Sequence, residues 1–351
     1  MRIALIAPPF IAVPPKKYGG TELFIAELAV GLKEKGIDIT LYTNGESTVP
    51  VDIRYLFKKE QWPLRTEMET TLRTMTHSSW AVKDAASRQF DLIHVNTAPS
   101  LSFSRFVDAP FVYTVHHDFQ PELAEYYETF PEVFYVTISD FQRFKLPMSK
   151  MRTVHHGIDP SLYELHEEKQ QYLTFLGRIA PPKGTHLAIE IAKKSGIPLK
   201  IAGEIQPIYQ DYWENEVKPH VDGKFIEYVG EVGIEEKNGL LGNSLAMLFP
   251  IQWDEPFGLV LIESMACGTP VLAMPGGSVA EIVKEGVSGY VNSSVDELAN
   301  SAKNLDLNPR AVRQYVEENF SLNRMVNKYI QLYMEIAASD ESEEEAERIV
   351  A

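Results

Sequence analysis

The stretch IALIAPPFIAVPPKKYGGTELFIAELAVGLKEKGIDITLYT, residues 3–43, decides the fold class. It begins with a short apolar run at 3–7, which is typical of a buried strand. Apolar residues then recur at helical spacing over 21–35, and Gly36 is placed to end that helix. A second apolar run follows at 37–43. This order of strand, helix and strand predicts a parallel sheet covered by helices.

The alternation of apolar runs and helical patterns continues along the chain in two series. In the first series, further strands are predicted at 91–95, 111–115 and 134–138. Prolines and polar residues interrupt the pattern at 147–171, after which the alternation starts again. The elements predicted for the second series are strands at 172–176, 199–202, 225–229, 246–249 and 270–273, and helices at 185–195, 258–266, 280–284, 295–303 and 310–319.

Two such series predict an α/β protein with two doubly wound, Rossmann-like domains that face each other across a cleft. Ligands of such sheets bind at the carboxyl ends of the strands, and the crevice between two domains is a natural site. We place the N-terminal domain at 1–165 and the C-terminal domain at 166–320. A long helix at 321–338 is expected to cross back to the N-terminal domain, and 339–351 is an acidic tail.

Composition narrows the class of protein. The 351 residues carry 49 acids and 33 bases, for a net charge of −16. This charge argues against a general nucleic-acid binder and disfavours docking on anionic lipid. No apolar stretch approaches the ~20 residues of a membrane span, and the first apolar run is too short for a signal peptide. The single cysteine, Cys267, fits a reducing compartment, so we expect a cytoplasmic protein.

A glycine-rich loop precedes the first helix. Gly19 and Gly20 let the backbone approach a ligand closely, and the start of a helix offers unpaired N–H groups to an anion. Thr21 is a candidate N-cap. The alternative is a capped loop that binds nothing.

A second loop, GRIAPPKG at 177–184, follows the first strand of the second series. Its two cations, Arg178 and Lys183, suit the two charges of a diphosphate. The alternative is a pair of solvated surface cations.

Two glutamates flank an apolar helix start in DEPFGLVLIE, residues 254–263. Glu255 lies in the turn before the predicted helix, and Glu263 lies within it. A carboxylate in such an apolar helix is costly to bury without a partner, and sugar or ribose hydroxyls are suitable partners. The alternative is a helix capped by Glu255 with an exposed Glu263.

Two histidines, His116 and His117, directly follow the predicted strand at 111–115. Polar residues at this place point to the ligand crevice, although a lone histidine there is more often structural. No spacing typical of metal ligands accompanies the pair, so we predict no metal site.

Taken together, these stretches resemble the glycosyltransferases of the GT-B fold, in particular the retaining family 4, also called glycosyltransferase group 1. The most specific part is EPFGLVLIESMACGTPV at 255–271, which is similar to the family's E-x7-E motif and its continuation. The resemblance covers residues 1–338. It departs from the family at Ser264, where alanine is usual, and in the loop 203–207, which lacks a second glycine. The segment 44–90 matches no known pattern.

The resemblance implies a role for each motif residue. Glu255 would meet hydroxyls of the donor sugar and Glu263 the ribose, while His116 would lie near the anomeric carbon. The implied catalytic residues are His116, Glu255, Arg178 and Lys183. The implied donor-binding residues are Gly19, Gly20, Arg178, Lys183, Glu255, Phe257, Gly258, Leu259 and Glu263.

The implied activity is that of a retaining hexosyltransferase. It would move a hexose from a UDP- or GDP-sugar to an acceptor hydroxyl on a saccharide, a small metabolite or a lipid, without a metal or other cofactor. The N-terminal domain would bind the acceptor and the C-terminal domain the nucleotide sugar. We expect no nucleic-acid partner, while a homo-oligomer is possible. The alternatives are a sugar-nucleotide epimerase or hydrolase of the same fold and a non-catalytic protein that binds nucleotide sugars.

Overall fold

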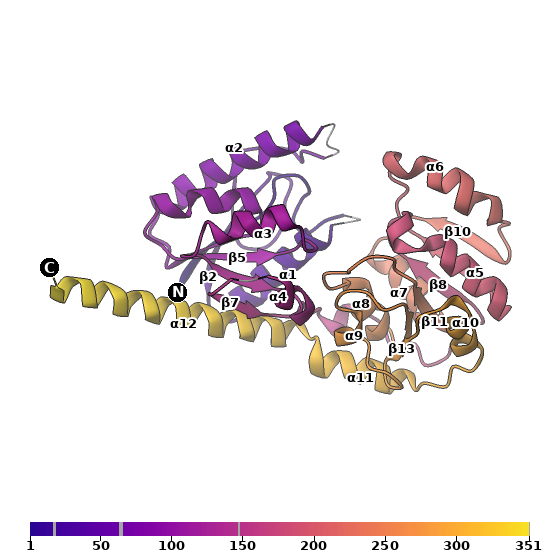
Figure 1. Ribbon diagram of the computed structural model, residues 1–351. Coiled ribbons are helices and arrows are strands. Elements are labelled where there is room, and N and C mark those ends of the chain that lie inside the picture. The colour runs from indigo at the N-terminus through magenta and orange to yellow at the C-terminus, as the bar shows by residue number, and fades with distance from the viewer. Residues whose placement is uncertain (17–18, 63–65, 147, 351) are drawn as a thin grey trace. The chain divides into compact units, whose positions relative to one another are not determined.

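The computed structural model describes residues 1–350 except 17–18, 63–65 and 147, and it does not describe the side chains of Ile234 and of 340–350. The chain divides into two units (Figure 1). Unit 1 comprises Met1–His156 and Leu322–Ala351, and unit 2 comprises Gly157–Ser321. The boundary predicted from the sequence, after residue 165, lies a little further along the chain. Each unit is built on a parallel sheet with flanking helices, which confirms the predicted α/β class with two Rossmann-like units.

Unit 1 contains a sheet of seven parallel strands in the order β3-β2-β1-β4-β5-β6-β7. The strands are β1 Arg2–Ile6, β2 Asp38–Thr43, β3 Asp52–Tyr55, β4 Leu92–Val95, β5 Phe111–Val115, β6 Phe134–Thr137 and β7 Met151–Thr153. The order reverses between β1 and β4, and the crevice at such a switch point is where doubly wound sheets bind ligands.

Helices cover both faces of this sheet (Figure 1). They are α1 Gly20–Glu34, α2 Glu67–Ala86, α3 Pro121–Glu128, α4 Asp140–Lys145, the 3₁₀ helix η1 Ala98–Phe106 and α12 Leu322–Val350. Alternate residues of β1 point to opposite faces. Ile3 and Leu5 join a core with α1 and α12, whereas Ala4 and Ile6 join a core with α2, η1 and α3.

Unit 2 contains six parallel strands in the order β10-β9-β8-β11-β12-β13. The strands are β8 Leu173–Leu176, β9 Leu199–Ala202, β10 Ile226–Gly230, β11 Ala246–Phe249, β12 Val271–Ala273 and β13 Gly289–Val291. The order again reverses, here between β8 and β11, so the second unit has a switch point of its own.

The helices of unit 2 include the predicted ones. The α-helices are α5 Thr185–Ser195, α6 Gln210–Tyr212, α7 Ile234–Gly242, α8 Leu259–Ala266, α9 Val279–Ile282, α10 Val295–Lys303 and α11 Pro309–Asn319. The short 3₁₀ and π turns are η2 Pro160–Leu162, η3 Pro181–Lys183, η4 Pro207–Tyr209, η5 Trp213–Val217 and η6 Lys218–His220. Helices α5 and α10 share one core with the strands, and α8 packs against α11 and β12.

The start of α1 corrects one prediction. Gly19, not Thr21, is the N-cap, and the helix already begins at Gly20. Gly19 has φ 151°, and a Cβ there would lie 2.9 Å from Pro15 Cβ. Only glycine tolerates this combination of backbone conformation and crowding. The threonine therefore lies inside the first turn, two positions after the N-cap.

The last helix extends beyond the predicted bounds of 321–338 into the acidic end of the chain. The backbone of α12 continues as a helix to Val350. Glutamate and alanine are good helix formers, and a helix that already exists adds residues more easily than a new one nucleates. Among the described residues, none of the helices combines the length and the apolar character that crossing a bilayer requires.

Candidate active site

The loop after β8 brings Lys183 to Glu255. Lys183 ends the turn η3, and its Nζ lies 2.6 Å from Glu255 Oε2. Both side chains are largely buried, at 16% and 10% exposure. The next residue, Gly184, has φ 72°, and a Cβ there would lie 1.9 Å from the carbonyl oxygen of Pro250. The loop can therefore pack closely only with glycine at this position, and Lys183 is not a solvated surface cation.

Trp253 holds both members of this pair. Its Nε1 donates to Glu255 Oε2 over 3.0 Å. Lys183 Nζ lies 4.5 Å from the centroid of the Trp253 ring. Lysine and indole thus converge on one carboxylate oxygen. The sequence patterns do not single out Trp253, although it stands only two positions before Glu255.

The turn after Glu255 leads directly into α8. Gly258 is the N-cap with φ 82°, and the helix begins at Leu259. Phe257 is buried, and its carbonyl accepts a hydrogen bond of 3.0 Å from Ser278 Oγ. Within the described part of the chain no side chain caps this helix, so Glu255 is not the capping residue of the alternative interpretation. The first N–H groups of α8 therefore lie only a few residues after Glu255, which belongs to the buried ion pair with Lys183. These groups form the positive end of the helix dipole.

Glu263 forms a second ion pair inside unit 2. It is 3% exposed, so the alternative of an exposed Glu263 is wrong. Lys237 Nζ in α7 lies 2.8 Å from Glu263 Oε1, and Tyr163 donates its hydroxyl to the same oxygen over 3.1 Å. These partners offset the cost of burying the carboxylate. Sequence reasoning misses Lys237 and Tyr163, which lie far from Glu263 in the chain.

Arg178 lies two positions after β8, in the loop that carries Lys183, and it is half-buried. The structure places Arg178, Lys183, Glu255, Phe257, Gly258, Leu259 and Glu263 in unit 2, on the segment after β8, in the turn before α8 and within α8. It places Gly19, Gly20 and His116 in unit 1.

His116 lies directly after β5 in unit 1. Its Nε2 is 2.9 Å from Asn96 Oδ1, which follows β4. The imidazole packs against the rings of Phe24, at 5.1 Å, and His156, at 5.8 Å. Burial, with a smaller contribution from His156, holds the pKa of His116 well below its usual range. His116 is therefore neutral at physiological pH, and its neighbour His117 is exposed.

A buried carboxyl group accompanies the glycine loop. Glu22 lies in the first turn of α1, and its Oε2 would be 3.0 Å from a Cβ at Gly19. Burial raises the pKa of Glu22 to about 7, and Glu60 adds to this effect. The sequence pattern includes Glu22 as the last residue of the glycine loop but assigns it no role, because a glutamate in the first turn of a helix is ordinary, and it does not indicate Glu60.

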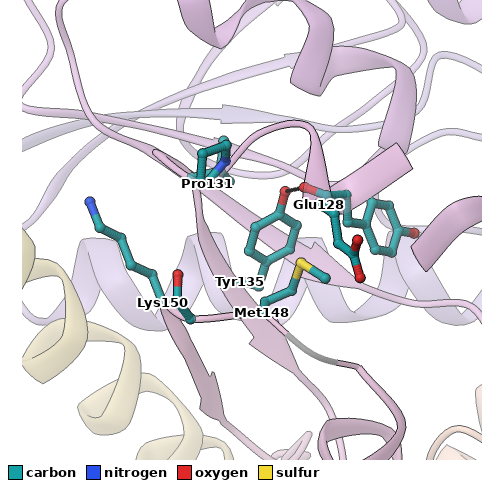
Figure 2. Close-up of a pocket in the computed structure, with 8 residues that line it drawn as sticks. Glu128, Pro131, Tyr135, Met148 and Lys150 are labelled. Atoms are coloured by element: carbon teal, nitrogen blue, oxygen red, sulfur yellow. Dashed lines mark hydrogen bonds between the residues drawn. The ribbon is translucent and has the colours of Figure 1, made fainter. Parts of the chain in front are cut away.

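A surface pocket lies elsewhere in unit 1 (Figure 2). Glu128, Pro131, Tyr135, Met148 and Lys150 are among its lining residues. Tyr135 donates its hydroxyl to the carbonyl of Tyr127, which is a structural contact. The described residues that line the pocket include none of the predicted site residues.

Two family models match the chain in succession. "Glycosyltransferase Family 4" matches residues 18–162, and "Glycosyl transferases group 1" matches residues 163–320. Among curated proteins, the spore coat protein SA of Bacillus subtilis is 22% identical and covers 95% of this chain and 99% of its own. The O-antigen chain mannosyltransferase C of Escherichia coli is also 22% identical, over 93% and 96% of the two chains.

Solved structures share the fold. Sucrose-phosphate synthase from Thermosynechococcus elongatus superposes with a TM-score of 0.80 at 19% identity, over 96% of this chain and 99% of that one. Anabaena HepE, solved in complex with UDP and glucose, superposes with a TM-score of 0.75 at 17% identity, over 95% and 100%. These similarities cover both units of the chain.

Proposed function

The chain belongs to the group 1 glycosyltransferases of family 4 and has their GT-B fold, and from this premise we propose that it is a retaining hexosyltransferase. It moves a hexose from a UDP- or GDP-sugar to an acceptor hydroxyl. The observation that carries the proposal is the buried pair of Lys183 and Glu255 beside the first turn of α8. That arrangement sets a cation, a helix N-terminus and a hydroxyl-binding carboxylate close together.

The diphosphate of the donor binds to the positive groups of unit 2. Lys183 and the first N–H groups of α8 supply charge and hydrogen bonds to phosphate oxygens, as helix N-termini commonly do. Arg178, in the same loop as Lys183, adds a second cation with a planar set of donors.

The two glutamates bind hydroxyl groups of the donor. Both hydrogen bonds that Glu255 receives from Lys183 and Trp253 go to Oε2, so within the described residues Oε1 is left to accept from sugar hydroxyls. Both bonds to Glu263 likewise go to Oε1, which leaves Oε2 for the ribose. Each carboxylate is thus held by one oxygen and offers the other.

The acceptor attacks the anomeric carbon on the same face of the sugar from which the nucleoside diphosphate departs. The bond from the anomeric carbon to the β-phosphate oxygen breaks while a bond to the acceptor oxygen forms. The acceptor proton passes to the departing phosphate, and the sugar retains its configuration. Lys183, Arg178 and the α8 N-terminus stabilise the growing phosphate charge, so the proposed reaction uses no metal ion.

The names of similar proteins support a hexose donor. One relative is named a mannosyltransferase, and HepE was solved with UDP-glucose and with UDP and glucose. The acceptor is a saccharide, a small metabolite or a lipid. A cytoplasmic location stays a prediction based on the single thiol of Cys267.

A ligand screen followed by a product assay tests the proposal. UDP, GDP and their hexose conjugates are added in thermal unfolding experiments, where a ligand at 100 times its Kd adds about 2.7 kcal/mol of stability. The stabilising donor is then incubated with the enzyme and EDTA, and the anomeric proton of the released or transferred sugar is followed by NMR. We expect a retained anomer and full activity in EDTA. Rapid formation of a new nucleotide sugar from the donor alone would instead identify an epimerase.

A further inference from the structure

Two buried amide side chains surround His116, and neither belongs to the motifs that the sequence singles out. Asn96 follows β4 and is 3% exposed, and Gln142 lies in α4 and is also 3% exposed. We propose that Asn96 is a positioning residue that locks His116 in the tautomer protonated on Nε2, so that the imidazole offers its Nδ1 only as a hydrogen-bond acceptor.

The orientation of the Asn96 amide follows from its two contacts. Its Nδ2 donates to the carbonyl oxygen of Ile6 over 3.1 Å, and its Oδ1 lies 2.9 Å from His116 Nε2. The flipped amide would place Oδ1 against the Ile6 carbonyl, which is two acceptors facing each other in a buried place. Such a contact is expensive because neither oxygen could be satisfied. Oδ1 therefore faces the imidazole and requires an N–H there.

A proton on Nε2 leaves Nδ1 unprotonated, because the ring is neutral. The described rings that pack on His116 bring no positive or negative charge to it. Phe24 is apolar, and burial lowers the pKa of His156 to about 3, so that this ring is neutral too. One tautomer is therefore selected by the hydrogen bond, and nothing in the described surroundings of the ring favours a second proton.

Gln142 fixes the backbone on either side of the same residue. Its Nε2 donates to the carbonyls of Val115, at 3.0 Å, and His117, at 2.7 Å. Its Oε1 accepts from the N–H of Ile138 over 2.9 Å, which sets the orientation of this amide as well. The His116 ring is thus held by Asn96 and its peptide units by Gln142.

The consequence for chemistry rests on the proposed function. His116 receives a hydroxyl proton from a sugar ligand in a hydrogen bond, and it does not donate a proton to the departing phosphate. Asn96 acts through His116 and touches no substrate itself. Asn96 stabilises one tautomer of His116, and because its amide is uncharged it does so without favouring a second proton on the ring.

Nitrogen NMR of the free protein tests the tautomer directly. Protein labelled with ¹⁵N in histidine rings is compared with a His116→Gln variant to assign the His116 signals. We expect a pyrrole-type Nε2 and a pyridine-type Nδ1 near neutral pH. A pyrrole-type Nδ1 in the unaltered protein overturns the proposal, and this measurement requires neither a substitution at Asn96 nor a substrate.

Two substitutions test the role of Asn96. Asn96→Ala removes the acceptor, and we expect the His116 signals to move toward the averaged shifts of mixed tautomers. Asn96→Asp loses the bond to the Ile6 carbonyl but keeps an acceptor for Nε2, so in folded Asn96→Asp protein we expect the Nε2-protonated form to persist while the new negative charge raises the pKa of His116. The matched control is Ser100→Ala, which removes a buried hydrogen bond to Ser78 without contact to His116. Unchanged His116 signals in folded Asn96→Ala protein contradict the proposal.

Kinetics separate this inference from the proposed function. If the donor is turned over, Asn96→Ala should lower kcat about ten-fold, the loss expected for one hydrogen bond, with a smaller change in KM. In Asn96→Asp, part of the lost kcat should be recovered at a pH above the pKa that His116 has in this variant. Absence of any transfer activity in the unaltered protein would reject the proposed function and leave the NMR result standing.

Discussion

At the scale of single residues, the ion pair of Lys183 and Glu255 carries most of the proposed chemistry. The motif 255–271 indicates both glutamates from the sequence alone, because acids within an apolar helix start need partners. It does not indicate Trp253, Lys237 or Tyr163 as those partners. Such contacts depend on how distant loops meet in three dimensions, and no local pattern encodes them.

Substitution of Lys183 tests the proposed charge stabilisation. Lys183→Ala should cost about 2–5 kcal/mol of transition-state stabilisation, because it removes a desolvated cation from the leaving phosphate. The measurement is kcat/KM for donor turnover. Lys194→Ala is the matched control, since this lysine lies in the neighbouring helix α5 and forms ion pairs with Glu190 and Asp296 at the surface. Equal loss in both variants would argue against a role for Lys183.

The buried carboxyl group of Glu22 makes the free energy of unfolding depend on pH. Its folded pKa of about 7 lies above the ordinary 4.5, so the folded state binds the proton more tightly. Stability is therefore lost as the pH rises from about 4.5 to 7, by roughly 3 kcal/mol in total. Glu22→Gln should gain stability relative to the unaltered protein at pH 8 but not at pH 4.5, as measured by urea unfolding. Glu34→Gln, at the exposed end of α1, should show no such difference.

At the scale of elements, the parallel strands were predictable and several helices were not. Strands β1, β2, β4, β5 and β6 are rich in apolar residues, and all but their first residues are buried, as expected for strands covered on both faces. Helix α2 is largely polar, with only one narrow buried stripe, and it escapes prediction together with the half-buried strand β3. The predicted N-cap of α1 is misplaced because the local pattern favours threonine, whereas crowding at Gly19 decides where the helix begins.

A buried hydrogen-bond network attaches α12 to the sheet of unit 1. Tyr333 hydroxyl lies 2.7 Å from His94 Nδ1, and His94 Nε2 lies 2.8 Å from Thr114 Oγ1. Tyr329 hydroxyl in turn lies 3.0 Å from the same Thr114 oxygen. Because Thr114 stands two positions before His116, the network supports the strand end that carries the proposed site.

Removing one hydroxyl from this network should loosen α12. Tyr333→Phe leaves His94 Nδ1 without its partner, which costs about 1–3 kcal/mol in a buried place. Hydrogen exchange should therefore quicken along α12, and the thermal midpoint should fall. Gln331→Ala, which removes only a surface hydrogen bond to Glu335 on the same helix, should change neither. Unchanged exchange in Tyr333→Phe would show that the network adds nothing to the docking of α12.

At the scale of the whole molecule, two parallel sheets and their order along the chain follow from the alternation of patterns. The assignment of the last helix to unit 1 depends instead on which apolar faces meet. Residues Met325, Val326 and Tyr329 of α12 share a core with β1 and α1. Helical spacing alone does not reveal which sheet such a face will cover.

The two units should respond differently to acid. Burial lowers the pKa of His77 to about 4 and of His94 and His156 to about 3, and all three lie in unit 1. Their unfolded forms take up protons below pH 6.5 while the folded forms do not, so stability falls with falling pH. Glu22 acts in the opposite direction with one proton. These three histidines against one glutamate leave a net loss of roughly 2–3 kcal/mol per pH unit near pH 5.5. His116, whose pKa burial also lowers, acts in the same direction as the three histidines.

Hydrogen exchange at pH 7 and pH 5.5, corrected for intrinsic rates, measures this response separately in each unit. We expect the protection of strands β1, β4 and β5 to drop at the lower pH by more than that of β8, β9 and β11. Equal changes in both sheets would contradict the argument from buried histidines.

The chain leaves unit 1 after His156 and returns to it only at Leu322. On the ribosome, the first sheet therefore emerges long before the helix that completes its apolar face, and unit 2 can finish its own core in the interval. A newly made chain therefore passes through a stage in which unit 2 is complete, while Phe24 and Gly31 of unit 1 still lack their α12 neighbours Tyr329 and Val326. Chaperones that bind apolar segments have their main opportunity in that interval, which closes when α12 is released.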